Sequence, residues 1–248
     1  WGYRCTLAGY KVAVTKASKV LHRMGAKKVS VNTFPTYYMW RNWIYFFIRY
    51  VKENDLEHLS YMFLKAVFQA VYECMYKGEH NVRETILYAY DDAIHGVRGQ
   101  AGEGKIFPAD YTEDLLVKVC RHCASFKNII LVSNGYEEEA ALIKEQLLAN
   151  SCTNIHICTS SNEVPALENA ITLHLCDYIF NLEESCLNTI RQENEGEFLK
   201  DIYIDRTFTP IATKEDLLFV KNYSFCQQYF LYSNQPLFLR CCKELRRK

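Results

Sequence analysis

The stretch from residue 128 to 133, Asn-Ile-Ile-Leu-Val-Ser, constrains the fold more than any other part of the sequence. A short run that is apolar throughout its centre is typical of a strand buried on both faces of a parallel sheet. Parallel strands need long connections, which are usually helices. We therefore expect a fold of the α/β class in which helices cover the sheet.

The segments around this strand continue the alternation of helices and strands. Acids at 137–139 open a helix, because negative side chains are favourable at the positive end of a helix. This alternation implies right-handed crossovers and a three-layer, Rossmann-like parallel sheet. The other expected elements are a helix that begins at 112–114, a strand over 154–158, a helix over 164–176 and a strand over 177–182.

The part of the chain before residue 110 predicts helices instead. Apolar residues at helical spacing indicate helices over 39–52, 59–75 and 81–94. The first of these is rich in aromatic residues and is expected to be a central core helix, with a helix lying in a membrane interface as the alternative interpretation. Four glycines within 96–104 predict a surface loop, because they neither follow a strand nor precede the Lys-Ser/Thr of a phosphate-binding loop.

The length of 248 residues fits a single large domain. We expect one domain over 1–248, with a further helix over 214–232. Its four parts are a basic lead-in over 1–33, a helical half over 34–110, an α/β half over 111–185, and a helical extension with a basic tail over 186–248.

The formal net charge is zero, but the charges are unevenly distributed. Residues 1–52 carry ten basic side chains and no acid, residues 53–239 have a net charge of −14, and the tail 240–248 has a net charge of +4. Such asymmetry indicates either basic surfaces for RNA or an acidic partner, or ends that fold against an acidic middle.

Eleven cysteines without a leader-like segment indicate reduced thiols in an intracellular protein, nuclear or cytoplasmic. Cys120 and Cys123 have the spacing of half a zinc site, but no second pair follows at a convincing distance, so we expect no metal there. No apolar run approaches the roughly 20 residues that span a bilayer, and we expect no membrane partner.

Residues 129–185 resemble the C-terminal half of PIN-like ribonuclease domains of the NYN type. The resemblance is carried by the strand Ile-Leu-Val-Ser, the acidic turn and helix after it, the strand Asn-Ile-His-Ile-Cys, and the segment Cys-Asp-Tyr-Ile-Phe-Asn-Leu-Glu-Glu. It implies a PIN-like fold and, in active members, hydrolysis of RNA with a divalent ion held by converging carboxylates.

The positions that carry this chemistry in the family differ here. The family's first strand ends in a catalytic Asp, where this chain has Asn32, and an acidic position after the second strand is occupied by Gly135. Asp177 matches a position that is not usually a metal ligand. An amide supplies only a neutral oxygen and glycine supplies no side-chain ligand, so the metal site is expected to be degenerate.

The interpretation that we favour is a non-catalytic PIN-like domain, a pseudo-nuclease, that serves as a protein- or RNA-binding scaffold within a larger intracellular protein. Protein partners are expected, and RNA could bind the basic N-terminal stretch by phosphate contacts and by stacking on Tyr37, Trp40 and Trp43. No cofactor is expected. The candidate nucleic-acid-binding residues are Lys19, Arg23, Lys27, Lys28 and Arg41.

Two alternatives remain open. An active ribonuclease would use Asp91, Asp92, Glu137 and Glu138 with Mg²⁺ or Mn²⁺. An unrelated Rossmann-like enzyme would instead bind a nucleotide at the carboxyl ends of the strands, near residues 133–135 and 159–161.

Overall fold

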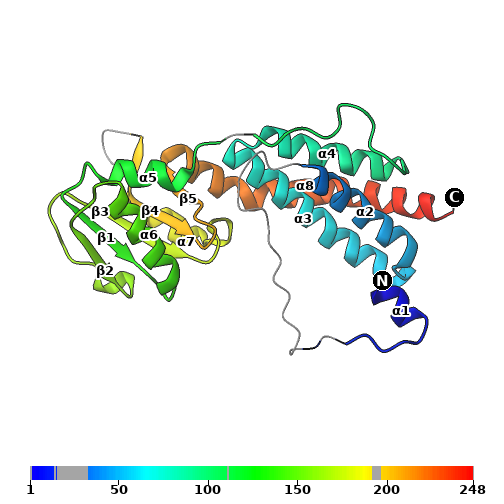
Figure 1. Cartoon of the computed structure of the whole chain (residues 1–248), viewed down its shortest axis with the longest axis horizontal. Helices are drawn as coiled ribbons and strands as arrows, with labels where there is room; N and C mark the ends of the chain where they lie inside the picture. The colour runs from blue at the N-terminus through cyan, green and yellow to red at the C-terminus, as the bar shows by residue number, and fades with distance from the viewer. Residues whose placement is uncertain (1, 14, 16–32, 111, 192–196, 248) are drawn as a thin grey trace. The chain divides into compact units, whose positions relative to one another are not determined.

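A computed structural model describes residues 2–13, 15, 33–110, 112–191 and 197–247 (Figure 1). The chain divides into two units, Trp1–Val31 and Asn32–Lys248. In the first unit α1 spans Gly2–Leu7. The degenerate position Asn32 and four of the candidate RNA-binding residues lie outside the described residues. Those four residues are Lys19, Arg23, Lys27 and Lys28.

The second unit contains a five-stranded sheet in the order β2-β1-β3-β4-β5. The first four strands in this order are parallel, and β5 runs antiparallel to β4. The sheet confirms the expected α/β class. Its strands are β1 (Asn128–Val132), β2 (Ile155–Cys158), β3 (Ala170–Cys176), β4 (Phe198–Asp205) and β5 (Pro210–Thr213).

One face of the sheet is covered by α5 (Leu115–Cys123) and α6 (Glu137–Ala149). Every residue of β1 is buried, as its apolar sequence predicts. Ile129 lies between Ile155 of β2 and Ile171 of β3 in the parallel register. Three side chains of α6, Ala140, Ile143 and Leu147, join the core beneath the sheet.

Two predictions after β2 are wrong. The helix expected over 164–176 is replaced by a connection containing η2 (Ser161–Glu163) and by β3, since Ala170–Cys176 pairs with β1 on one side and β4 on the other. The strand expected over 177–182 is the short 3₁₀ helix η3 (Ile179–Asn181), followed by α7 (Glu184–Thr189). In the sheet, the strand that pairs with β3 on that side is β4 and not the segment 177–182.

The helical half consists of α2 (Phe34–Tyr50), α3 (Leu56–Lys77), α4 (His80–Ile94) and the long C-terminal helix α8 (Lys214–Arg246), with η1 (Glu53–Asp55) before α3. The helices expected over 39–52, 59–75 and 81–94 are confirmed with shifted ends, and 96–104 is a loop. Phe63 at the centre is fully buried and its ring lies against those of Trp40, Trp43, Phe47 and Phe238.

The basic C-terminal tail is part of α8, which continues well beyond the expected end at residue 232. Arg246 Nη1 lies 3.0 Å from Glu53 Oε2, and Lys243 Nζ lies 3.7 Å from Glu53 Oε1. Two cations of the tail are therefore neutralised by an acid of the middle segment. Among the helices of the described part of the chain, none is both long and apolar enough to cross a membrane.

Candidate functional site

The carboxyl ends of the parallel strands meet at the turn 133–135 after β1. Asn134 and Gly135 have φ of 48° and 90°, in the left-handed region, so the chain turns sharply into α6. Asn134 Nδ2 donates to the carbonyl of Leu175 at 2.9 Å, and its backbone N–H donates to Thr159 O at 3.1 Å. The turn is thus fixed to both neighbouring strands, where ligands bind in open α/β sheets.

The acids at this edge are held by one arginine. Arg206 Nε lies 3.2 Å from Glu139 Oε1, and Arg206 Nη1 lies 3.7 Å from Asp177 Oδ1. Glu137 Oε1 accepts a hydrogen bond from Ser133 Oγ at 3.4 Å. The degenerate positions Gly135 and Asp177 therefore share this edge of the sheet, and the carboxylates of Asp177 and Glu139 are paired with Arg206.

The two aspartates of the nuclease alternative lie elsewhere, on α4 in the helical half. Asp91 is exposed, with His95 Nδ1 3.2 Å from its Oδ1, whereas Asp92 is buried. Helix α4 packs on α2, α3 and α8, while α6, which carries Glu137 and the exposed Glu138, packs on α5. In the described ranges, no group of three or more His, Cys, Asp or Glu side chains is arranged to hold a metal ion.

A second polar cluster, on β3 and β4, involves His174 and Asp201. Burial favours a raised pKa for Asp201, but hydrogen bonds from Arg191 and His174 outweigh it and hold this pKa far below its usual range. Arg191 donates from its Nε at 2.7 Å and its backbone N–H at 3.1 Å. Ser161 Oγ lies 3.4 Å from His174 Nδ1. Because Arg191 occupies both oxygens of Asp201, this cluster anchors the segment after α7 to the sheet.

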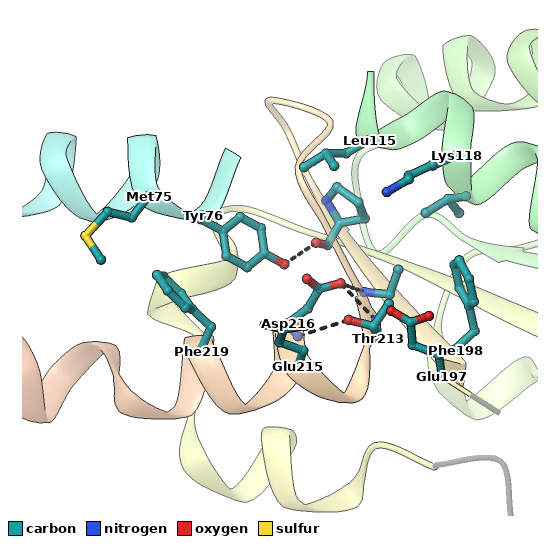
Figure 2. A pocket seen from close by; sticks show the side chains of 13 residues that line it. Met75, Tyr76, Leu115, Lys118, Glu197, Phe198, Thr213, Glu215, Asp216 and Phe219 are labelled. Atoms are coloured by element: carbon teal, nitrogen blue, oxygen red, sulfur yellow. Dashed lines mark hydrogen bonds between the residues drawn. The ribbon is translucent and has the colours of Figure 1, made fainter. Parts of the chain in front are cut away.

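The pocket of about 430 Å³ in Figure 2 lies where α8 begins. Asp216 accepts hydrogen bonds from the backbone N–H groups of Ala212 and Thr213 at 3.0 and 2.9 Å, and Thr213 Oγ1 accepts one from Asp216 N–H at 3.1 Å. Tyr76 donates its hydroxyl to Pro210 O at 2.5 Å (Figure 2). These polar groups satisfy one another as the N-terminal cap of α8.

The cysteines at the CxxC spacing lie in the core beneath the sheet. Cys120 and Cys123 are fully buried on α5, and Cys152 Sγ lies 3.6 Å from the carbonyl oxygen of Cys120. Burial raises the pKa of the Cys120 thiol to about 12. A thiol with this pKa stays protonated near neutral pH, which suits an apolar packing role.

The buried polar centre of the helical half is built around Asp92. Its carboxylate accepts hydrogen bonds from the hydroxyl of Tyr37 and from Lys105 Nζ. Burial and the hydrogen bond to Asp92 raise the pKa of Tyr37 to about 12. Arg41, one turn after Tyr37, lies 3.4 Å from the Tyr37 hydroxyl through its Nη1, so the network continues to this buried arginine.

Beyond Arg41 the helical half opens into a pocket of about 620 Å³ that is lined by four arginines. Arg41 and Arg49 come from α2, Arg98 from the glycine-rich loop, and Arg246 from the end of α8. No carboxylate lines the pocket. Its remaining lining residues are Asn42, Tyr45, Ile48, Gly99 and Leu245.

Two of these arginines have unused donors inside the protein. Arg41 is 3% exposed and donates through Nη2 to Gly99 O at 2.7 Å, and Arg246 donates through Nη2 to Phe47 O at 3.0 Å. The Nε atoms of both arginines are buried without a hydrogen-bond partner in the described structure. A buried donor left without a partner costs about 1–3 kcal/mol.

The other two arginines are exposed at the pocket. Among the described residues, neither Arg49 nor Arg98 forms an ion pair with a carboxylate. The guanidinium carbons of Arg98 and Arg41 lie 5.6 and 5.8 Å from the centre of the Tyr45 ring, so both cations are within cation–π distance of this ring. Because Arg246 is paired with Glu53, Arg41, Arg49 and Arg98 supply the positive charge that the pocket offers to an anion.

Sequence reasoning found one of these four residues. Arg41 is one of the candidate RNA-binding residues of the basic N-terminal stretch, and the structure places it in the pocket wall. Arg98 lies in the loop that we expected to be only a surface loop. Arg49 belongs to the basic stretch and Arg246 to the basic tail. The excess of basic side chains in these two segments was the signal that could have pointed to both residues.

Compared with known proteins, the chain matches no protein-family model, no curated protein and no solved structure.

Proposed function

We propose that this chain is a non-catalytic PIN-like domain that binds single-stranded RNA through the arginine-lined pocket. The observation that carries the RNA-binding part is the convergence of four arginines in a pocket without a lining carboxylate; of these, Arg246 is paired with Glu53, and among the described residues the other three have no ion pair with a carboxylate. Guanidinium groups bind phosphate with paired, charge-assisted hydrogen bonds, and phosphate contacts dominate the affinity of proteins for nucleic acids.

The PIN-like part of the proposal rests on the resemblance over residues 129–185. The order of β1, α6 and β2 agrees with that resemblance, and the chain departs from it where β3 replaces the expected helix. The non-catalytic part rests on the placement of the four acids, since Asp91 and Asp92 lie on α4 while Glu137 and Glu138 lie on α6.

Binding of RNA to the full chain tests this proposal directly. A labelled single-stranded RNA of roughly 15 nucleotides should bind saturably in a filter assay. The logarithm of the affinity should fall with the logarithm of the salt concentration with a slope of about −2 to −3, because each neutralised phosphate contributes about −0.7. A lack of saturable binding at low salt, or an affinity independent of salt, would refute RNA binding.

The same assay separates the alternatives. Incubation of the bound RNA with Mg²⁺ or Mn²⁺ should leave it intact. Cleavage that depends on the metal, and that is lost in Glu137→Gln, would instead support an active nuclease and overturn the non-catalytic part of the proposal.

A further inference from the structure

Helix α8 carries an exposed apolar stripe that the rest of the described chain does not cover. Leu218, Phe225, Tyr229 and Tyr232 are 61, 72, 68 and 86% exposed. Residues at spacings of seven, four and three share one face of a helix, so these side chains form a stripe, which the exposed Asn222 interrupts between Leu218 and Phe225. The exposed Pro236, four residues after Tyr232, continues it.

The stripe is distinct from the face of α8 that builds the core. Leu217, Val220, Leu231 and Phe238 are buried against the rest of the second unit. Helix α8 is therefore apolar on two faces, which is unusual for a surface helix of a monomer. Exposed patches of large apolar side chains mark interaction surfaces.

The stripe has a symmetry that points to its occupant. Leu218 and Pro236 stand nine residues before and after the level of Gln227, whose own side chain lies on the opposite face of the helix, and Phe225 and Tyr229 stand two residues before and after it. Tyr232 has the polar Asn222 as its counterpart. If two copies of α8 pack antiparallel and cross at Gln227, Phe225 of each copy meets Tyr229 of the other. A two-fold axis requires a self-complementary surface of this kind.

The charges beside the stripe fit the same arrangement on one side. Glu215 and Arg240 lie at nearly equal distances from Gln227 along the helix and on the same side of the stripe. Glu215 of each copy would therefore face Arg240 of the other copy. Both are exposed, and Arg240 Nε now lies 2.8 Å from Glu244 Oε1. On the other side Lys221 would lie by Tyr232 of the second copy, within reach of its ring.

Lys214 and Lys243 would also approach each other across the interface. Their repulsion is reduced because Lys243 Nζ lies 3.7 Å from Glu53 Oε1. The arrangement as a whole buries the stripe and adds two symmetric pairs of opposite charge.

From these observations we infer that the chain forms an antiparallel homodimer through the stripe on α8. The inference does not depend on RNA binding, since the residues of the stripe do not line the arginine pocket.

Sedimentation equilibrium of the full chain over a range of concentrations tests the dimer. We expect a mass of twice 29.0 kDa at high concentration.

Phe225→Glu with Tyr229→Glu should give the monomer mass with an unchanged helical circular dichroism spectrum. Met39→Glu, at a position of α2 that is 55% exposed, is the matched control and should remain dimeric. A wild-type chain that is monomeric throughout would overturn the inference, as would a dimer that survives the double substitution.

A charge swap tests the antiparallel register. Glu215→Arg should weaken the dimer about tenfold, and the double variant Glu215→Arg with Arg240→Glu should restore the affinity. A double variant that dimerises no better than Glu215→Arg would contradict the register and therefore the proposed interface.

Discussion

Replacing Asp92 with alanine is expected to lower the free energy of unfolding by about 3–5 kcal/mol, because it leaves buried charged and polar partners without a counterpart. The carboxylate is 1% exposed and accepts from both Tyr37 and Lys105. Arg41 contacts the Tyr37 hydroxyl of the same network and would lose the attraction of the Asp92 carboxylate. Urea unfolding of the full chain, followed by circular dichroism, measures the effect.

The neighbouring Asp91 provides a matched control. Its side chain is 55% exposed and its ion pair with His95 lies on the surface. Asp91→Ala should change the free energy of unfolding by no more than about 0.5 kcal/mol. Equal losses in the two variants would show that the buried network around Asp92 does not contribute as described.

The loss in Asp92→Ala should depend on pH in a defined direction. Burial alone would raise the pKa of Asp92, but hydrogen bonds from Lys105 and Tyr37, together with Arg41, outweigh it and lower this pKa. A carboxyl whose pKa is lower in the folded state stabilises the fold above its unfolded pKa, about 3.9. The difference between wild type and Asp92→Ala should therefore shrink as the pH falls below that value.

Reversing two charges of the arginine pocket, with Arg49→Glu and Arg98→Glu, is expected to weaken RNA binding by about a hundredfold or more. A hydrogen bond to a charged group contributes about 1.5–3 kcal/mol, and both substitutions also add repulsion. Both side chains are exposed and outside the core, so the fold should remain intact. The salt dependence of the affinity should become weaker as well.

Two exposed lysines on the sheet half give a control with the same change in net charge. Lys127→Glu with Lys144→Glu should reduce RNA affinity far less than the pocket variant, because neither lysine lines the pocket. A similar loss in both double variants would mean that RNA responds only to overall charge.

The roles of Asp92 also affect how the nuclease alternative is tested. Loss of cleavage in Asp92→Asn would be ambiguous, because the same change perturbs the buried centre of the helical half. Glu137 and Glu138 are exposed at the start of α6, so substitutions there leave the fold intact and give a clear answer.

The strand β1 and the helix α6 could be predicted because the types of residue in each suit the environment in which the element lies. The centre of β1 is wholly apolar and buried on both faces, and the acids of α6 lie in its first turn. The helix wrongly expected at β3 shows the limit of this reasoning. Ala170–Cys176 is apolar and contains good helix formers, and pairing with β1 and β4 decided its conformation.

Strand β4 and the arginine pocket could not be read from the sequence for a different reason. Lys200, Asp201 and Asp205 interrupt β4 with charges, and Asp201 is acceptable there because Arg191 pairs with it. The pocket joins α2, the glycine-rich loop and the end of α8, which are far apart in the sequence. Only the packing of the helical half brings its arginines together.

Photo-crosslinking with a single-stranded RNA that carries 4-thiouridine tests most directly whether the arginine pocket is the RNA site. We expect adducts on peptides from α2, around Tyr45, and from the loop that carries Arg98, and excess unlabelled RNA should compete them away. Adducts confined to the turn 133–135 or to other residues of the sheet half, with none on the pocket peptides, would contradict this account.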